Sequence, residues 1–322
     1  MKVLKRIGLG AGALVVLLAA ALAVSAGYHQ WQLSREDAHL DPPGVMVDVE
    51  GHRLHVYAEG PCDGADTGPA LVFMSGGGTA SPYLDFKPLF SDLSADHCVA
   101  VVEKAGYGYS DVGGGDRDVD TLLTETRAAL NGAGVPGPYV LLPHSMSGIE
   151  ALRWAQEHPD DVAGIIGLDP AVPASYDGYP IPHPAAVRLL ALGAETGLTR
   201  VLPGVADSAA AIESGRLSEE EAAEYRTITH RRTLTADMRN ELTSVETSAA
   251  LVDAEGVPTV PMHLLVSNGE GTGLDPSEWR GMLDAYAAVA GGDAVHLDAG
   301  HYLHQEATEQ VADQVRAFLE GL

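Results

Sequence analysis

The chain has 322 residues, of which 46% are hydrophobic, and a formal net charge of −26. A hydrophobic fraction of this size excludes a disordered chain and indicates a globular fold with one large core. The strong negative charge repels phosphate backbones and anionic lipid headgroups, so it argues against a nucleic-acid-binding protein.

The N-terminus differs from the rest of the chain. Three basic residues among the first six precede an uncharged run from Ile7 to Tyr28. About twenty apolar residues span a bilayer as a helix, and basic flanking residues stay on the cytoplasmic side. The run is longer than the roughly 7–15 residues of a signal-peptide core. We therefore prefer the interpretation that residues 1–28 form a membrane anchor. This anchor holds the body outside the cytoplasm at the cell membrane. The alternative is a signal peptide cleaved after Val24-Ser25-Ala26, which would give a secreted protein.

Residues 29–44 are polar and end in Pro42-Pro43-Gly44, which predicts a linker. The body, residues 45–322, begins with two short β-type runs, 45–49 and 53–57. They flank Glu50-Gly51 and predict a β-hairpin.

Strands and helices then alternate along the body. Short apolar runs predict strands, and segments with helical periodicity predict helices. The expected strands are 70–74, 98–102, 139–142, 164–168, 262–266 and 294–297, and the expected helices are 83–93, 121–130, 148–158 and 307–319. Alternation of this kind predicts an α/β fold with a mostly parallel sheet covered by helices on both faces.

The strand pattern disappears from about residue 171 to 256. This stretch is first rich in proline and then helical and acidic. Ser218-Glu219-Glu220-Glu221 resembles a capping box at the start of a helix. We therefore expect a helical insertion.

The chain contains two cysteines, Cys62 and Cys98, and neither has the spacing of a metal or redox motif. In an exported body they can pair as one disulfide. The alternative is two unrelated thiols.

Ser145 lies between an expected strand and an expected helix. The strand 139–142 runs into Pro143-His144-Ser145-Met146-Ser147-Gly148, where the helix begins at once. A turn of this kind pushes a nucleophile clear of the sheet and places it at the N-terminus of a helix. Pro143 and Ser147 stand where the common form of this turn has glycine.

These motifs together resemble the α/β-hydrolase superfamily and its membrane-anchored bacterial branch. The matching pieces are Val47-Asp48-Val49-Glu50-Gly51-His52-Arg53-Leu54-His55, Ala105-Gly106-Tyr107-Gly108-Tyr109-Ser110-Asp111, the serine turn, and Gly300-His301-Tyr302-Leu303-His304. The resemblance covers the chain from about residue 42 to the C-terminus and thins across 171–256. It implies an α/β-hydrolase fold with a helical lid insertion and a serine hydrolase of esterase or lipase type. It says little about the substrate.

The resemblance also implies a base for Ser145, because a serine hydroxyl is a weak nucleophile. This fold places its histidine after the last strand, where His301 stands. His304 would suggest a metal pair with His301, but no third ligand is evident. We therefore expect no metal and no cofactor.

Three acids are candidates to orient His301. Glu270 follows the strand 262–266 and lies 31 residues before His301 (301 − 270), as the family's usual acid does. The loop around Glu270 lacks the usual Gly-x-x-Asp pattern. Asp169, at the end of the strand 164–168, is the alternative, and Asp275 comes third. We prefer Glu270.

Two backbone N–H groups are expected to stabilise the negative charge of a tetrahedral intermediate, by the same resemblance. They belong to Gly77 and Met146, which would form the oxyanion hole. Ser75-Gly76 stands where the family usually has His-Gly.

The first functional hypothesis is hydrolysis of a carboxylic ester through an acyl-serine intermediate, with a small-molecule ester or acyl compound as substrate. A serine at the turn argues against the epoxide hydrolases and haloalkane dehalogenases of this superfamily, which need a carboxylate nucleophile. A small-peptide aminopeptidase, an acyltransferase or a carbon–carbon bond hydrolase remains open on the same residues. The second hypothesis is a non-catalytic, membrane-anchored binding module.

Overall fold

Eight strands form one twisted sheet. The computed structural model describes residues 2–62 and 68–322. The strand order is β1-β2-β4-β3-β5-β6-β7-β8. The first two strands form an antiparallel hairpin, β2 pairs antiparallel with β4, and the remaining pairs are parallel. The strands are β1 Val45–Val49, β2 His52–Glu59, β3 Ala70–Met74, β4 Val99–Glu103, β5 Tyr139–Ser145, β6 Val162–Pro170, β7 Met262–Val266 and β8 Asp293–His296.

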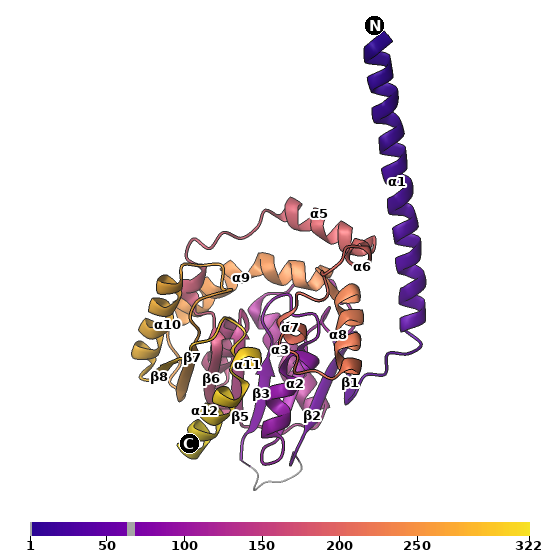
Figure 1. Ribbon diagram of the computed structural model, residues 1–322. Coiled ribbons are helices and arrows are strands. Elements are labelled where there is room, and N and C mark those ends of the chain that lie inside the picture. The colour runs from indigo at the N-terminus through magenta and orange to yellow at the C-terminus, as the bar shows by residue number, and fades with distance from the viewer. Residues whose placement is uncertain (1, 63–67) are drawn as a thin grey trace.

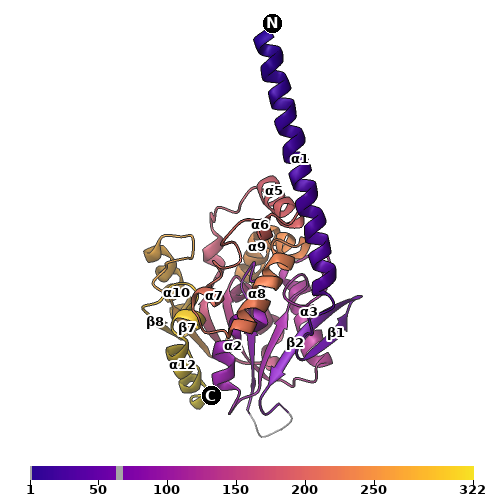
Figure 2. The ribbon, with the colours of Figure 1, turned by 45° about the vertical axis from the view of Figure 1, so that its right-hand side comes forward.

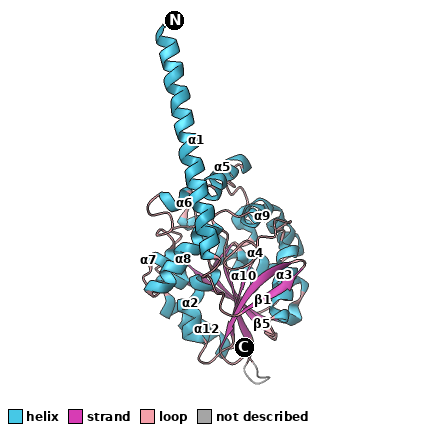
Figure 3. Cartoon of the chain, turned by 90° about the vertical axis from the view of Figure 1, so that its right-hand side faces the viewer, coloured by secondary structure: helices cyan, strands magenta, loops and turns pink. Residues whose placement is uncertain are grey.

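Helices cover both faces of this sheet, which confirms the predicted α/β fold (Figure 3). On β3, Val72 and Met74 belong to the hydrophobic core on one face of the sheet, whereas Leu71 and Phe73 belong to the core on the other face. Successive side chains of a strand point to opposite faces, so a fully apolar strand needs cover on both sides. The helices are α1 Lys2–Glu36, α2 Pro82–Leu93, α3 Val119–Gly132, α4 Ser147–Glu157, α5 Pro184–Glu195, α6 Leu198–Val201, α7 Ala210–Glu213, α8 Glu219–Arg232, α9 Ala236–Glu255, α10 Pro276–Ala290, α11 Leu303–Glu306 and α12 Thr308–Glu320, with short 3-10 helices at Pro159–Asp161 and Pro173–Tyr176.

The segment 171–256 forms helices and loops between β6 and β7, above the ends of the parallel strands (Figure 1). Helices α5 to α9 belong to it. The predicted capping box at the start of α8 is confirmed, because Ser218 and Glu221 exchange side-chain and backbone hydrogen bonds. We call the segment 171–256 the lid.

Helix α1 leaves the body beside the lid and extends away from it on the lid side (Figures 1 and 2). Within the described residues it is the one helix long and apolar enough to cross a membrane, and its most apolar window has a mean hydropathy of 1.8. The helix continues to Glu36, whereas the sequence predicted a linker from residue 29. Polar side chains of this last part bind the lid, so tertiary contacts extend the helix beyond its apolar run.

Cys62 and Cys98 form a disulfide bond, which ties the loop after β2 to the start of β4. The sequence left this pairing open. The bond closes a loop with a sequence separation of 36 residues. A crosslink of this length restricts the unfolded chain and stabilises the fold by about 4 kcal/mol in the chain-entropy model.

The double variant Cys62→Ala/Cys98→Ala is therefore expected to lose about 4 kcal/mol of unfolding free energy. Urea denaturation of the variant beside the wild-type chain, both without reductant, measures this loss. A variant as stable as the wild type would mean that the bond contributes nothing. Wild-type protein treated with reductant provides the matched comparison without any substitution.

Candidate active site

Ser145 lies on a sharp turn between β5 and α4. Its φ of 54° is in the left-handed region, which costs a non-glycine residue about 1–3 kcal/mol unless its surroundings hold it there. A Cβ at Gly148 would lie 2.1 Å from the carbonyl oxygen of Ala171. A Cβ at Gly76 would lie 2.8 Å from the Cβ of Ser145. Two glycines therefore permit the close backbone approach that presents the Ser145 hydroxyl above the sheet.

The two departures from the glycine pattern fit this turn. The Ser147 hydroxyl donates to the carbonyl oxygen of Met74 at 2.7 Å. The same hydroxyl lies 2.9 Å from the carbonyl oxygen of His144. Pro143 is buried within β5 and lies opposite Met74 of β3. Ser147 thus ties the first turn of α4 to the end of β3, which glycine could not do.

His301 lies in the loop between β8 and α11 and reaches Ser145. Its Nε2 atom is 2.8 Å from the Oγ of Ser145. Its backbone N–H donates to the carbonyl oxygen of Glu270 at 2.8 Å, which holds the loop in place. An imidazole at this distance can accept the hydroxyl proton.

Asp169, at the end of β6, is the acid that contacts His301. Its Oδ2 atom is 2.6 Å from the Nδ1 of His301. Its other oxygen, Oδ1, accepts the backbone N–H of Ser267 at 2.8 Å and the indole N–H of Trp279 at 2.9 Å. Asp169 is fully buried, so these donors replace the water that a carboxylate would otherwise bind.

The preferred candidate acid, Glu270, does not bring its carboxylate to His301. The Glu270 side chain is exposed, and this residue meets His301 through its backbone carbonyl. The loop turns at Gly269 and Gly271, whose φ values are 86° and 88°. Asp275 is the N-cap of α10, and hydrogen bonds from Ser277 lower the pKa of its carboxyl.

Gly77 and Met146 lie on the two loops that flank Ser145. Both line the same cavity as Ser145 and His301. A Cβ at Gly77 would lie 2.6 Å from the Cε of Met146, so the Met146 side chain packs directly against Gly77. Met146 immediately precedes α4, where backbone N–H groups point out of the helix and carry the positive end of its dipole.

A buried network supports the loop after β3. Lys104 donates to the carbonyl oxygen of Ser75 at 3.3 Å and forms an ion pair with Glu241 of α9. The Tyr107 hydroxyl donates to Glu241 at 2.6 Å and accepts the backbone N–H of Gly78 at 3.2 Å. Burial and the Glu241 charge raise the pKa of Tyr107, so its hydroxyl keeps the proton that it donates. The network therefore connects the lid helix α9 to the start and the middle of that loop.

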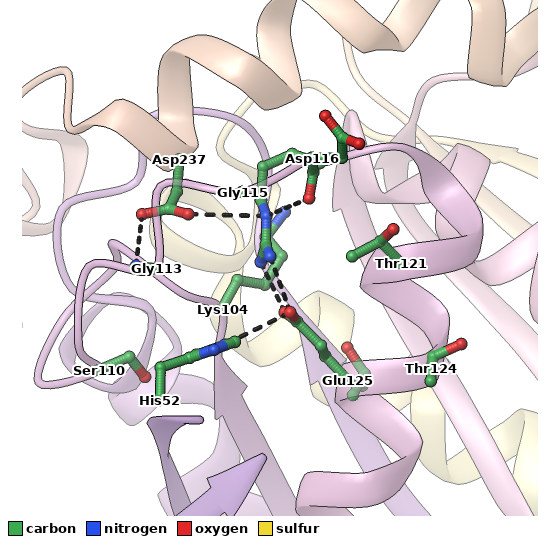
Figure 4. A network of polar contacts seen from close by, with 12 residues as sticks. His52, Lys104, Ser110, Gly113, Gly115, Asp116, Thr121, Thr124, Glu125 and Asp237 are labelled. Carbon is green, nitrogen blue, oxygen red and sulfur yellow. Dashed lines mark hydrogen bonds and ion pairs between the residues drawn. The ribbon is translucent and has the colours of Figure 1, made fainter. Parts of the chain in front are cut away.

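A second carboxylate of α9 also reaches the body (Figure 4). Asp237 accepts the backbone N–H of Gly113 at 3.0 Å and lies 3.6 Å from the Nε of Arg117. Arg117 forms two hydrogen bonds with Glu125 of α3, at 2.6 and 2.7 Å. The buried carboxylates of Asp237 and Glu241, one helical turn apart, thus hold α9 over the sheet. These carboxylates and their partners in the body are far apart in the chain, so no local sequence pattern marks them as a group.

A cavity of about 270 Å³ opens beside Ser145. Its lining is mostly apolar and aromatic, and half of the residues that line it come from the lid. The apolar and aromatic side chains of this lining include Tyr176, Tyr179, Leu234, Met238 and Leu242 from the lid and Trp279 from α10. The lid therefore shapes much of the space beside Ser145 in which a ligand could bind.

Two further histidines lie near His301 without reaching Ser145. His144 donates through Nε2 to the carbonyl oxygen of His301 at 3.1 Å. Burial lowers the pKa of His144 well below its usual range, so it adds no positive charge beside the base. His304 lies 2.7 Å from the Oδ2 of Asp85 on α2, where both side chains are buried.

Comparison with known proteins gives the family. The sequence matches the profile of the alpha/beta hydrolase family over residues 71–314. It is 40% identical over 243 residues to the uncharacterized protein YbdG of Bacillus subtilis (strain 168), which covers 75% of this chain and 72% of that protein. The chain therefore belongs to the alpha/beta hydrolase family.

Solved structures show the same fold at low sequence identity. The enol-lactonase from Burkholderia xenovorans LB400 has a TM-score of 0.66 and 18% identity, and the match covers 86% of this chain and all of that one. A thermophilic esterase from Thermogutta terrifontis has a TM-score of 0.58 and 20% identity, over 86% of this chain and 98% of that one. Likeness at this level shows the fold and leaves the reaction to be argued from the site.

Proposed function

We propose that this hydrolase cleaves a carboxylic ester through an acyl-serine intermediate. The observation that carries the proposal is the unbroken chain of hydrogen bonds from Asp169 through His301 to Ser145, at 2.6 and 2.8 Å. A serine, a base at hydrogen-bond distance and a third group that orients the base are the signature of an activated nucleophile.

Each of these residues has a separate role in the proposed reaction. Ser145 Oγ attacks the ester carbonyl while His301 takes its proton, and Asp169 stabilises the imidazolium that forms. The backbone N–H groups of Gly77 and Met146 stabilise the oxyanion, and each such donor contributes about 3–4 kcal/mol to lowering the barrier. His301 then returns the proton to the leaving alcohol. Water then attacks the acyl-serine carbonyl while His301 takes a proton from it. His301 returns this proton to Ser145 Oγ as the carboxylic acid leaves.

We also propose that α1 anchors the protein in the cell membrane with its body outside the cytoplasm. Three features support this location: the apolar run in α1, the basic residues before it, and the disulfide bond, which is typical of an oxidising compartment. The last turns of α1 bind the lid, so the helix is also part of the folded structure.

The test of the proposed function is the intact mass of the full chain after exposure to a fluorophosphonate, beside its Ser145→Ala variant. We expect one covalent adduct on the wild type and none on the variant, because only an activated serine attacks the phosphorus. Hydrolysis of 4-nitrophenyl esters by the same two proteins gives the second readout. A folded wild-type chain that takes up no adduct and hydrolyses no ester would favour the binding-module hypothesis.

A further inference from the structure

The lid carries an exposed apolar patch. Its members lie on α5, on α6 and in the loop that follows, and their exposed fractions range from 36% to 70%. We call them the lid patch: Leu189, Leu190, Leu192, Val201, Leu202 and Val205. Large side chains gathered in this way on the surface of a soluble domain mark an interaction site.

The lid patch also lacks the acidity of the rest of the protein. Residues 178–206 contain three charged side chains, Arg188, Glu195 and Arg200, and their net charge is +1 (2 − 1) in a chain of −26. Arg188 and Glu195 pair with each other at 2.6 Å. Arg200 points away from solvent toward α1, with 6% of its side chain exposed. The patch therefore offers an almost uncharged surface in an otherwise acidic protein.

Helix α1 binds the lid next to this patch (Figure 2). Arg200 donates to both carboxylate oxygens of Glu36 at 2.7 and 2.8 Å, and its Nε donates to the Nδ1 of His29 at 2.8 Å. A Cβ at Gly197 would lie 2.5 Å from the Cβ of His29 and 3.2 Å from the carbonyl oxygen of Ser25. Contacts between helix and lid thus extend back along α1 to Ser25.

This contact sets the level of a bilayer relative to the lid. The uncharged run before Ser25, from Ile7 to Val24, has 18 residues. At a rise of 1.5 Å per residue it is about 27 Å long, close to the roughly 30 Å of a hydrocarbon core. Just beyond it, Tyr28 and Trp31 are 44% and 52% exposed, and such rings are enriched at the membrane–water boundary. The outer surface of the bilayer would therefore lie at the level of α6.

We infer that the lid patch rests on the outer surface of the bilayer that α1 spans. The helix and the patch share one side of the molecule, and the one acidic residue of 178–206, Glu195, is paired with Arg188, so little negative charge opposes contact with lipid headgroups. Burial of apolar side chains at the headgroup boundary stabilises the contact. This inference does not depend on catalysis by Ser145.

The experiment places a fluorescent probe at one position at a time in the full chain. Leu190→Cys lies in the patch, Val16→Cys lies in α1 at 67% exposed, and Val289→Cys lies on α10 at 73% exposed. Each cysteine is labelled with NBD without reductant, since the two native cysteines form a disulfide. The proteins are reconstituted into phosphatidylcholine vesicles with and without spin-labelled phosphatidylcholine. Leu202→Cys serves as a second patch position should Leu190→Cys fail to fold.

We expect the spin-labelled lipid to quench the probes at Leu190 and Val16 and to leave the probe at Val289 unchanged. Quenching at Val16 alone would overturn the inference, because α1 would be inserted and the patch still in water. A blue-shifted but unquenched probe at Leu190, dependent on protein density, would show a second copy on the patch and would equally overturn it. Absence of quenching at Val16 would show that α1 does not lie in the bilayer, and this result would also overturn the inference. Fluorophosphonate labelling of Ser145, measured separately, keeps failure of the proposed function distinct from all these outcomes.

Discussion

Asp169→Asn is expected to lower kcat for ester hydrolysis by about 10⁴-fold, the effect of the same change in a serine–histidine–aspartate triad. The reason lies in the donors around this residue. The backbone N–H of Ser267 and the indole N–H of Trp279 both require an acceptor at the Oδ1 position. The amide of asparagine therefore keeps its oxygen there and turns its NH₂ group toward His301.

An NH₂ group that faces Nδ1 favours the wrong tautomer of His301. The imidazole then carries its proton on Nε2, 2.8 Å from the Ser145 hydroxyl, and cannot accept another. Steady-state hydrolysis of a 4-nitrophenyl ester measures the loss, and thermal unfolding checks that the variant is folded.

Glu270→Gln is the matched control. The Glu270 side chain is exposed, and its contact with His301 comes from the backbone, which the substitution leaves in place. We expect kcat to stay at the wild-type value. The reverse result, with Glu270→Gln inactive and Asp169→Asn active, would restore the acid that the sequence favours.

Lys104→Met is expected to lower the unfolding free energy by about 3–5 kcal/mol, because it leaves a buried carboxylate without its partner. Lys104 and Glu241 have side chains 6% and 5% exposed, and Glu241 would keep only the Tyr107 hydroxyl. Urea denaturation of the full chain in detergent measures the loss. The loop after β3 also loses its Lys104 hydrogen bond, so slower fluorophosphonate labelling of Ser145 should accompany the destabilisation.

Arg226→Met provides the matched control on the surface. Arg226 pairs with Asp207 at 2.6 Å, but these side chains are 41% and 59% exposed. An exposed pair contributes at most about 1 kcal/mol, so we expect little change. The double variant Lys104→Met/Glu241→Leu removes both charges and should recover most of the stability that Lys104→Met loses. Equal effects of Lys104→Met and Arg226→Met would contradict the role given to the buried pair.

The positions of the strands and of the helices α2, α3, α4 and α12 followed from the sequence alone. Continuous apolar runs such as 70–74 and 98–102 have no polar face, so they predict strands buried on both sides wherever they occur in the chain. The serine turn is equally local, because strand, small residues and helix are adjacent in sequence. Local patterns of this kind do not depend on distant partners.

The helix α10 and the helical residues of α1 beyond Tyr28 were not predicted. Residues 276–290 follow a glycine-rich loop, and an aspartate such as Asp275 is compatible both with the N-cap of a helix and with a catalytic acid. The last turns of α1 are polar, and ion pairs with Arg200 and Arg231 hold them against the lid. Helical structure that rests on distant partners leaves a weak signal in the local sequence.

The α/β-hydrolase fold, the serine turn and the place of His301 after the last strand could be predicted from local sequence patterns. Other features depend on contacts between distant residues. These contacts bring Asp169 to His301, support the loop after β3 and join α1 to the lid. Asp169 and His301 are 132 residues apart, and Lys104 and Glu241 are 137 apart. Folding brings such side chains to the same end of the sheet, and which of them meet depends on φ values and loop turns that spacing along the chain does not encode.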